Sequence, residues 1–227
     1  MSITDSPGPR ITVTPNGPYH VVGDVPVVAK AQVETELGEP IAWAAGPELA
    51  HKARYALCRC GQSGRKPFCD GTHLRVSFEA EDAIRERHAT EYPGTGVTLL
   101  DDRDICVHAG FCGTAVTNVW KMVRKTDDTT VRSMLIAMVE RCPSGAITYS
   151  LDGGATENEP RLRPEIGVNV NGPLWVTGGI PVDVGDEGSL PARNRVALCR
   201  CGASGRKPLC DGSHKAAGFV DDPRPNE

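Results

Sequence analysis

A sixteen-residue segment that occurs twice constrains this chain more than any other feature of its sequence. Residues 58–73 read CRCGQSGRKPFCDGTH, and residues 199–214, 141 positions later, read CRCGASGRKPLCDGSH. Each copy contains three cysteines and one histidine in the order Cys-x-Cys, eight residues, Cys, three residues, His. Thiolates and imidazoles are strong metal ligands, so the repeated spacing predicts two similar metal sites.

The duplication extends upstream of the cysteines. NGPYHVVGDVPVV, which starts at Asn16, resembles NGPLWVTGGIPVD, which starts at Asn171, at an offset of 155 instead of 141. The change of offset places about fourteen extra residues of the first copy within 34–52. Each copy therefore reads as a strand, an Asn-Gly-Pro turn, a second strand and the cysteine loop. Two copies are too few for a solenoid, and we expect a pseudo-two-fold pair in which each small sheet covers the apolar face of the other.

Composition restricts the class of protein. The chain has 227 residues, with 25 glycines, 18 prolines and only 5% aromatic residues, which predicts small, loop-rich units with modest cores. Its net charge of -4 at pH 7 argues against nucleic acid or an anionic membrane as the main partner. We find no apolar run near the roughly 20 residues of a membrane span and no signal-peptide pattern, so we expect a cytoplasmic protein. In that compartment, nine cysteines favour metal binding over disulfides.

A different pattern occupies the segment between the two copies. Residues 80–92, AEDAIRERHATEY, are charged and predict a helical connector that ends at PGTG. VTLLDD predicts a strand, and apolar residues at helical spacing after the cap Thr114 predict a helix. A second predicted helix has an apolar face formed by Met134, Leu135, Met138 and Val139.

The sequence thus predicts an α+β protein in which two small β-rich units form an intramolecular pseudo-two-fold pair and a third, α+β unit is inserted between them. We place the first repeat unit at 1–79, a linker at 80–96, the central unit at 97–151, a second linker at 152–164 and the second repeat unit at 165–227.

The repeated residues supply three thiolates and one imidazole to each site: Cys58, Cys60, Cys69 and His73 in the first copy, and Cys199, Cys201, Cys210 and His214 in the second. Both Zn²⁺ and a [2Fe–2S] cluster accept such a set. Structural zinc sites usually pair their ligands as Cys-x2–4-Cys, whereas Cys-x-Cys can place both sulfurs on one iron of a two-iron cluster. The third cysteine and the histidine, four residues apart on one face of a helical turn, would then hold the other iron.

The complete motif, C-R-C-G-x-S-G-R-K-P-x-C-D-G-[ST]-H, resembles that of the CDGSH iron–sulfur domain, the mitoNEET-like family. Both copies match at every defined position, including Ser63 with Pro67 and Ser204 with Pro208. The resemblance implies a [2Fe–2S] cluster bound by three cysteines and one histidine in each copy. Family members with one motif are homodimers, so the resemblance implies that a chain with two motifs forms the same pair internally, as a monomer.

Four motif residues suggest how the loop would meet a cluster. Pro67 and Pro208 suit the first turn of a helix, where a missing N–H group costs nothing. We expect the N–H groups of that turn, with Ser63 or Ser204, to donate hydrogen bonds to cluster sulfurs and so raise the reduction potential.

The remaining motif residues are small or charged. Gly71 and Gly212 would let the backbone approach the cluster closely. We interpret Asp70 and Asp211 as structural acids in the first turn of a helix. The cations of the two loops are either solvated charges or a guide for an acidic redox partner: Arg65, Lys66, Arg206 and Lys207.

The central unit contains three further cysteines, Cys106, Cys112 and Cys142, the last in a Cys-Pro dipeptide. CVHAGFC and CPSGAI resemble the divergent mono-cluster ferredoxin family and the bacterial ferredoxins with a single [3Fe–4S] cluster, over roughly 98–150. An ordinary [4Fe–4S] pattern would place another cysteine where Ala109 stands. Three thiolates fit a [3Fe–4S] cluster best, while a [4Fe–4S] cluster with His108, water or another non-cysteine ligand stays open.

These residues predict a multi-cluster iron–sulfur electron-transfer protein and not a complete enzyme. The sequence has no flavin or nicotinamide fingerprint, no P-loop and no Ser/His/Asp arrangement, so we expect a reductase or an oxygenase as redox partner. The alternatives are a protein that transfers clusters or senses redox state or iron, a structural zinc protein, and an enzyme subunit whose active site forms only with a partner. We expect the three tryptophans in the core and not as electron relays, and the other histidines show no ligand spacing: Trp43, Trp120 and Trp175; His20, His51 and His88.

Overall fold

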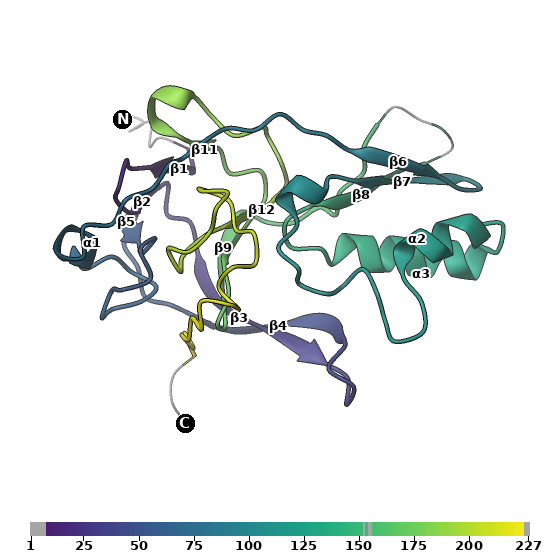
Figure 1. Cartoon of the computed structure of the whole chain (residues 1–227), viewed down its shortest axis with the longest axis horizontal. Helices are drawn as coiled ribbons and strands as arrows, with labels where there is room; N and C mark the ends of the chain where they lie inside the picture. The colour runs from purple at the N-terminus through teal and green to yellow at the C-terminus, as the bar shows by residue number, and fades with distance from the viewer. Residues whose placement is uncertain (1–7, 152, 154–155, 225–227) are drawn as a thin grey trace, which may run out of the picture.

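The structure of the protein is a computed structural model that describes residues 8–151, 153 and 156–224. In this part of the chain the strands form three small sheets, and the helices are few and mostly short, so the predicted α+β class is confirmed. Figure 1 shows β1, β2, β5 and α1 at one end of the longest axis, and β6–β8 with α2 and α3 at the other end. No helix in the described ranges combines the length and the apolar character needed to cross a membrane.

The first sheet contains strands from both repeat units, in the order β11-β1-β2-β5. β1 and β2 form an antiparallel pair joined by the predicted Asn-Gly-Pro turn, in which Asn16 has a φ of 50°. β11 belongs to the second repeat unit and pairs in parallel with β1 of the first. The bounds are Arg10–Val13 for β1, Tyr19–Val22 for β2, Arg54–Leu57 for β5 and Val182–Asp183 for β11.

The second sheet also contains strands from both repeat units, in the order β12-β10-β9-β3-β4. Here strands of the first unit join a sheet of the second, so the two units exchange strands. β3 belongs to the first repeat unit and pairs in parallel with β9 of the second, with Val27 opposite Ile166. In the first sheet, Val182 lies opposite Ile11, and these are the corresponding positions of the two copies at the offset of 155. The bounds are Val27–Glu34 for β3, Pro40–Glu48 for β4, Glu165–Asn169 for β9, Leu174–Thr177 for β10 and Arg195–Leu198 for β12.

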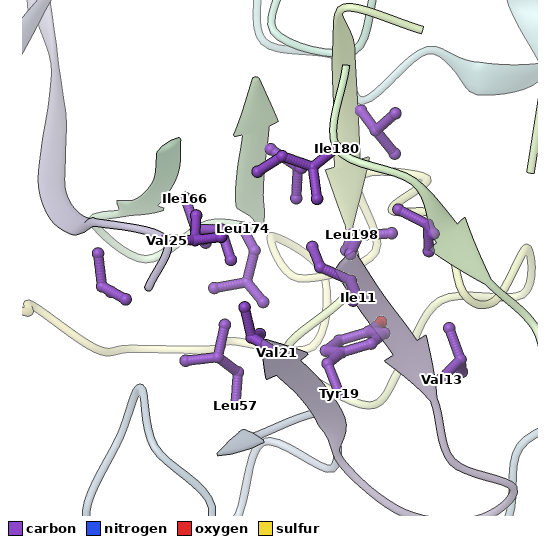
Figure 2. Packing of buried hydrophobic residues seen from close by; sticks show 14 of the residues in the cluster. Ile11, Val13, Tyr19, Val21, Val25, Leu57, Ile166, Leu174, Ile180 and Leu198 are labelled. Atoms are coloured by element: carbon purple, nitrogen blue, oxygen red, sulfur yellow. The ribbon is translucent and has the colours of Figure 1, made fainter. Parts of the chain in front are cut away.

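Both sheets bury their apolar side chains in one core. Figure 2 shows side chains of the first copy, such as Ile11, Val21 and Leu57, interleaved with Ile166, Leu174 and Leu198 of the second. These positions alternate with more exposed ones along β1 and β2, as expected for strands with one buried face. A unit of about 60 residues buries too little surface to be very stable alone, and the shared core supplies the rest.

The extra residues of the first copy form the outer part of a hairpin between β3 and β4. This hairpin reaches the central unit, where the Trp43 ring lies 5.1 Å from Phe111 and 5.0 Å from Trp175, between ring centroids. The Trp43 indole N–H also donates to the carbonyl of Arg141 at 3.1 Å. The expectation that Trp43 is a core residue is therefore wrong: it is half-buried and joins three parts of the molecule.

The central unit packs two helices on an antiparallel sheet, β6-β7-β8. α3 begins after Asp128, whose carboxylate accepts hydrogen bonds from the N–H groups of Thr130 and Val131. Leu135, Met138 and Val139 are buried on its inner face, as predicted, and pack against Val97, Leu99 and Ile147 of the sheet. Met134, which the sequence pattern places on the same face, is 54% exposed, so that part of the prediction is wrong. The bounds are Thr90–Pro93 for β6, Val97–Asp101 for β7, Val119–Met122 for α2, Thr129–Glu140 for α3 and Ile147–Leu151 for β8.

The predicted helical connector does not form. Residues 80–89 have no regular structure, and Thr90–Pro93 forms the edge strand β6. Asp82 forms an ion pair with Arg59 at 2.7 Å, and Ile84 packs on the shared core. A helix spans a shorter distance than an extended chain with the same number of residues, and would not allow both contacts. The tertiary contacts therefore override a weak helical propensity. Of the expected second linker, residues 152, 154 and 155 lie outside the described part.

The first helix of the central unit is also shorter than predicted. It begins at Val119, and its N-cap is Asn118, whose side chain accepts from the N–H group of Lys121. Thr114 instead closes a turn, with its hydroxyl accepting from the N–H group of Thr117, and Val116 is 85% exposed. An Asn side chain caps a helix as well as Thr does, so the pattern of apolar residues alone could not place this helix end.

Candidate metal centres

The structure brings together the four predicted ligands of each repeat unit, as two pairs. In the first copy, Cys58 Sγ lies 3.8 Å from Cys60 Sγ, and Cys69 Sγ lies 3.4 Å from His73 Nδ1. In the second copy, the corresponding distances are 3.7 Å between Cys199 and Cys201 and 3.4 Å between Cys210 and His214. Two thiolates on one side and a thiolate with an imidazole on the other is the pairing expected from the spacing.

Backbone hydrogen bonds fold each loop back onto the strand that precedes it. β5 ends at Leu57, and the next residue, Cys58, donates its N–H to the carbonyl of Pro67 at 2.7 Å. Cys69 donates to the carbonyl of Ala56 at 2.9 Å. The same two bonds occur in the second copy, from Cys199 to Pro208 and from Cys210 to Ala197, both at 2.9 Å. The first and third cysteines are therefore positioned by a strand, on a rigid part of the fold.

Pro67 and Pro208 do not begin a helix, so that expectation is wrong. Each follows a cis peptide bond within the loop, and the short helix α1 (Thr72–Arg75) starts only after Cys69. The Ser63 hydroxyl donates to the carbonyl of Phe68 at 2.7 Å, and the Ser204 hydroxyl donates to that of Leu209 at 2.7 Å. A hydroxyl has one hydrogen, so the hydroxyl groups of both serines close their loops, while the backbone N–H of Ser204 donates to the sulfur of Cys199.

The Asp-Gly pair of the motif shapes the turn beside the third cysteine. Asp70 accepts hydrogen bonds from the N–H groups of Thr72 at 3.0 Å and Gly64 at 2.8 Å. These bonds, first those from Thr72, hold the pKa of Asp70 well below its usual range. Gly71 has a φ of 85° and donates its N–H to Cys69 Sγ at 3.4 Å. Gly212 has a φ of 89° and donates in the same way to Cys210 Sγ, so the glycines aim a backbone donor at a sulfur.

Burial affects the protonation of the thiols. It raises the pKa of Cys60 to about 11 and that of Cys210 to about 12. A hydrogen bond between Cys199 and Cys201 lowers the pKa of the first thiol and raises that of the second. Most of these thiols are therefore protonated at neutral pH in the metal-free chain, and binding a metal releases protons.

The three cysteines of the central unit line one cavity of about 190 Å³. Cys106 Sγ accepts the N–H of His108 at 3.4 Å and lies 3.7 Å from Nη1 of Arg103. Burial and the neighbouring Cys106 and Cys142 raise the pKa of Cys112. Ala109 also lines the cavity, as does His108. The cavity thus has three sulfurs, and an alanine stands where an ordinary four-cysteine site would have a fourth.

The arrangement of donors suits clusters better than single ions. A zinc ion needs four ligands within about 2.3 Å of one point. Among the described residues, no group of three or more His, Cys, Asp or Glu side chains is placed to hold one metal ion. Two separate donor pairs fit the two irons of a [2Fe–2S] cluster, and three sulfurs around a cavity fit a larger cluster.

Two residues that the sequence analysis did not select support these centres from outside. Tyr19 is fully buried in the shared core, and its hydroxyl donates to the carbonyl of Cys199 at 2.7 Å, with the carbonyl of Pro208 also within reach at 3.1 Å. A residue of the first copy therefore holds the loop of the second. Position 174, which corresponds to Tyr19, is a leucine, and this difference between the copies was the available signal.

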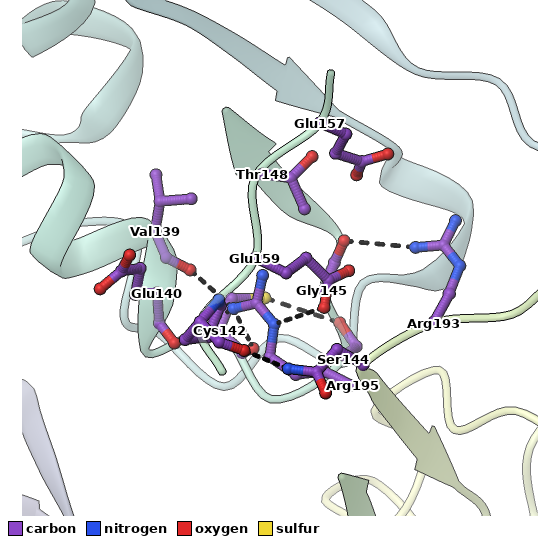
Figure 3. A network of polar contacts seen from close by, with 12 residues as sticks. Val139, Glu140, Cys142, Ser144, Gly145, Thr148, Glu157, Glu159, Arg193 and Arg195 are labelled. Atoms are coloured by element: carbon purple, nitrogen blue, oxygen red, sulfur yellow. Dashed lines mark hydrogen bonds and ion pairs between the residues drawn. The ribbon is translucent and has the colours of Figure 1, made fainter. Parts of the chain in front are cut away.

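The second such residue is Arg195, whose side chain is 0% exposed. It donates to the carbonyls of Val139 at 2.9 Å, Glu140 at 3.1 Å and Cys142 at 2.9 Å, and it pairs with Glu159 at 3.3 Å. Figure 3 shows this network between β12 and the end of α3. Arg195 therefore fixes the loop of the third central cysteine to the strand that leads into Cys199.

Two protein families match this chain. The family described as iron-binding zinc finger, CDGSH type, matches residues 16–74 and 171–215. The family described as divergent 4Fe-4S mono-cluster matches residues 92–152. These ranges contain all the candidate ligands described above. No curated protein is similar enough to the chain to count as a match.

Proposed function

Because this chain is an iron–sulfur protein with two CDGSH domains flanking a divergent mono-cluster ferredoxin-like domain, we propose that it is a multi-cluster electron-transfer protein. Each CDGSH domain would hold one [2Fe–2S] cluster, and the central domain would hold one [3Fe–4S] or [4Fe–4S] cluster. Such clusters accept and release single electrons, and the protein supplies ligands, burial and hydrogen bonds that set their potentials.

The observation that carries this proposal is the paired placement of donors in both CDGSH loops. Cys58 with Cys60, and Cys69 with His73, would each hold one iron of the first cluster. The second copy repeats these pairs to within about 0.1 Å. A neutral imidazole in place of a thiolate raises the reduction potential relative to a site with four cysteines, which suits these clusters to accept electrons.

In the central domain we propose Cys106, Cys112 and Cys142 as ligands, because all three line one cavity. His108 is the candidate for a fourth ligand, since it lies at the same cavity, two residues from Cys106. Its side chain is exposed, however, and its backbone N–H already donates to Cys106 Sγ, which favours a role beside the sulfur. A [3Fe–4S] cluster is therefore the preferred occupant.

We propose that the two CDGSH domains form a pseudo-two-fold pair within a monomer. Two observations support this proposal: corresponding residues pair in the two parallel strand exchanges, and one apolar core contains strands of both domains. The exchange satisfies within one chain the pairing that a single-motif protein obtains from a second copy.

Metal and sulfide analysis of protein purified without oxygen tests the proposed function. We expect about seven irons per chain with a [3Fe–4S] centre, or about eight with a [4Fe–4S] centre, and about eight acid-labile sulfides in both cases. Electron paramagnetic resonance separates the two cases, because a [3Fe–4S] cluster gives a signal while oxidised. Reversible reduction without loss of iron supports electron transfer, and a reductase or an oxygenase is then the expected partner. A colourless protein with about three zinc ions would exclude the proposal.

One observation favours a second candidate function, the transfer of clusters. His73 is only half-buried, so the proposed ligand pair with Cys69 is open to solvent. Incubation of the loaded protein with an excess of an apo-ferredoxin distinguishes the two functions. Cluster transfer within minutes supports donation, and retention of all clusters through repeated reduction supports electron transfer.

A further inference from the structure

The two CDGSH sites have the same ligands but different surroundings. His214 is 7% exposed, whereas His73, its counterpart in the first site, is half-buried. Cys210 is 2% exposed, whereas Cys69 is half-buried. The two sixteen-residue loops differ at only three positions, so the loops themselves do not explain this difference in access.

The central domain supplies part of the cover of the second site, beside residues of the repeat units such as Lys30. The segment 106–112, which we call the cap loop, runs over the outer side of the second CDGSH loop. Val107 packs against Ala197 and Cys210, and it is 4% exposed. The ammonium group of Lys215 donates to the carbonyl of His108 at 2.9 Å. The cap loop therefore contacts a proposed ligand, Cys210, and the residue next to another, His214.

The glycines of the two motifs confirm that only one loop is covered. A Cβ atom added to Gly212 would lie 3.2 Å from Cδ2 of His108 and 3.3 Å from the carbonyl oxygen of Val107. A Cβ atom added to Gly71, at the same place in the first loop, would meet nothing within 4 Å. The cap loop thus occupies space that is open solvent at the first site.

Two cations of the second copy hold the cap loop, whereas the residues at the corresponding positions of the first copy are exposed. Arg206 donates to the carbonyls of Arg103 and Asp104, just before the cap loop, and Lys215 holds its middle. The counterpart of Arg206 is Arg65, which is exposed, and that of Lys215 is Leu74, which is 77% exposed. Within the described ranges, no hydrogen bond joins residues 58–76 to residues 92–151. In Figure 1, α1 of the first site and the central domain lie at opposite ends of the molecule.

We propose that the cap loop makes the two CDGSH sites functionally different: the first site exchanges with partners, and the second is sealed by the central domain. The cap loop begins and ends with Cys106 and Cys112, so ligation at the central site would hold the cap in place. Loss of the central cluster would then open the second site. This inference rests on the proposed function for its clusters, whereas the cap itself is a property of the chain.

The cap is tested by the reactivity of the two ligand histidines in the full-length loaded protein. Diethyl pyrocarbonate modifies an accessible imidazole nitrogen, and peptide mass spectrometry reports His73 and His214 separately. We expect His73 to react about tenfold faster or more, because three charge-assisted hydrogen bonds, from Arg206 and Lys215, close the cap. In the double variant Arg206→Ala/Lys215→Ala, the rate at His214 should approach that at His73.

The chain supplies a matched control, the double variant Arg65→Ala/Leu74→Ala, which alters the corresponding positions of the uncapped site. It should leave the rate at His214 unchanged. Equal rates at the two histidines of the unaltered protein would overturn the proposal, as would an unchanged rate at His214 in Arg206→Ala/Lys215→Ala. If this variant fails to fold, as judged by circular dichroism, the pair Gly212→Ala and Gly71→Ala replaces it. Both glycines have nearly the same φ, so a change at His214 with Gly212→Ala alone reports the cap.

Iron release to the chelator ferrozine tests the link to the central site. The unaltered protein should lose the iron of one CDGSH site quickly and that of the other slowly. Cys106→Ala, which disables the central site, should convert the slow phase into the fast one, and a persistent slow phase would contradict the link. A protein without [2Fe–2S] clusters would refute the proposed function and leave no two phases to compare. The histidine rates would still decide whether the cap exists, so the two failures are distinguishable.

Discussion

Arg195 lies on the short strand β12, and we expect its replacement to lower the stability of the protein strongly. Its side chain is 0% exposed and donates to the carbonyls of Val139, Glu140 and Cys142. Val139 and Glu140 lie in the last turn of α3, where carbonyl groups have no i+4 helical donor, although that of Val139 also accepts the N–H of Cys142 at 3.2 Å. The guanidinium group therefore caps a helix, positions the loop of Cys142 and pairs with Glu159.

The change Arg195→Met keeps the length of the side chain and removes its charge and donors. A hydrogen bond to a charged group contributes about 1.5–3 kcal/mol, but bonds that share one guanidinium group are coupled, so their contributions do not simply add. Removing one partner of a buried ion pair costs about 3–5 kcal/mol, because the other charge is left buried without a partner. We expect this cost in the free energy of unfolding, since Glu159, 16% exposed, would lose its partner and the carbonyls of α3 their cap.

Urea unfolding followed by tryptophan fluorescence measures this cost. The chain offers the control Arg54→Met, because Arg54 has the same position in the first copy and is exposed. This control should change the stability by less than about 0.5 kcal/mol. If Arg195→Met and Arg54→Met differed by less than about 1 kcal/mol, the network in Figure 3 would not stabilise the junction between the domains.

Three further changes test other contacts. Tyr19→Phe removes the donor to Cys199 and Pro208 and should cost about 1–3 kcal/mol in urea unfolding, with faster iron loss from the second CDGSH site than from the first; equal acceleration at both sites would contradict this role. Trp43→Ala removes two ring contacts and the bond to Arg141 and should lower stability by about 1–3 kcal/mol; calorimetry should show the central domain unfolding before the rest, and a single unshifted transition would argue against the hairpin as a connector. Leu135→Ala opens a cavity in the central core, where Leu135 is 0% exposed, and should cost about 2–5 kcal/mol without changing the CDGSH absorption; a cost below about 1 kcal/mol would show that the site refills by repacking.

Some of the architecture could be predicted because it depends on near neighbours in sequence. α3 follows from apolar residues at helical spacing, and its inner face holds Leu135, Met138 and Val139 as predicted, whereas the cap Asp128 is identified only in the structure. The helix predicted for residues 80–89 is wrong because their contacts are distant in sequence: Asp82 binds Arg59, and Ile84 joins the shared core. Propensity over ten residues differs by only a few kcal/mol between helix and coil, so such contacts decide the outcome.

The strand exchange is beyond local reasoning for the same reason. Nothing in the sequence of β3 indicates that, besides β4 of its own copy, it pairs with β9 of the other copy. The duplicated pattern predicted a pair of units, but the partner of each strand depends on which arrangement buries both apolar faces at once.

The sequence by itself determined the chemistry of the candidate sites: three thiols and one imidazole in each repeat, three thiols in the centre, and the family that each segment resembles. Only the tertiary structure decided how alike the two repeats are. Nearly identical loops acquire different surroundings, because Arg206 and Lys215 meet the central domain while Arg65 and Leu74 meet solvent. Ligand spacing is fixed by a few covalent bonds, whereas access to the ligands is fixed by packing between segments far apart in the chain.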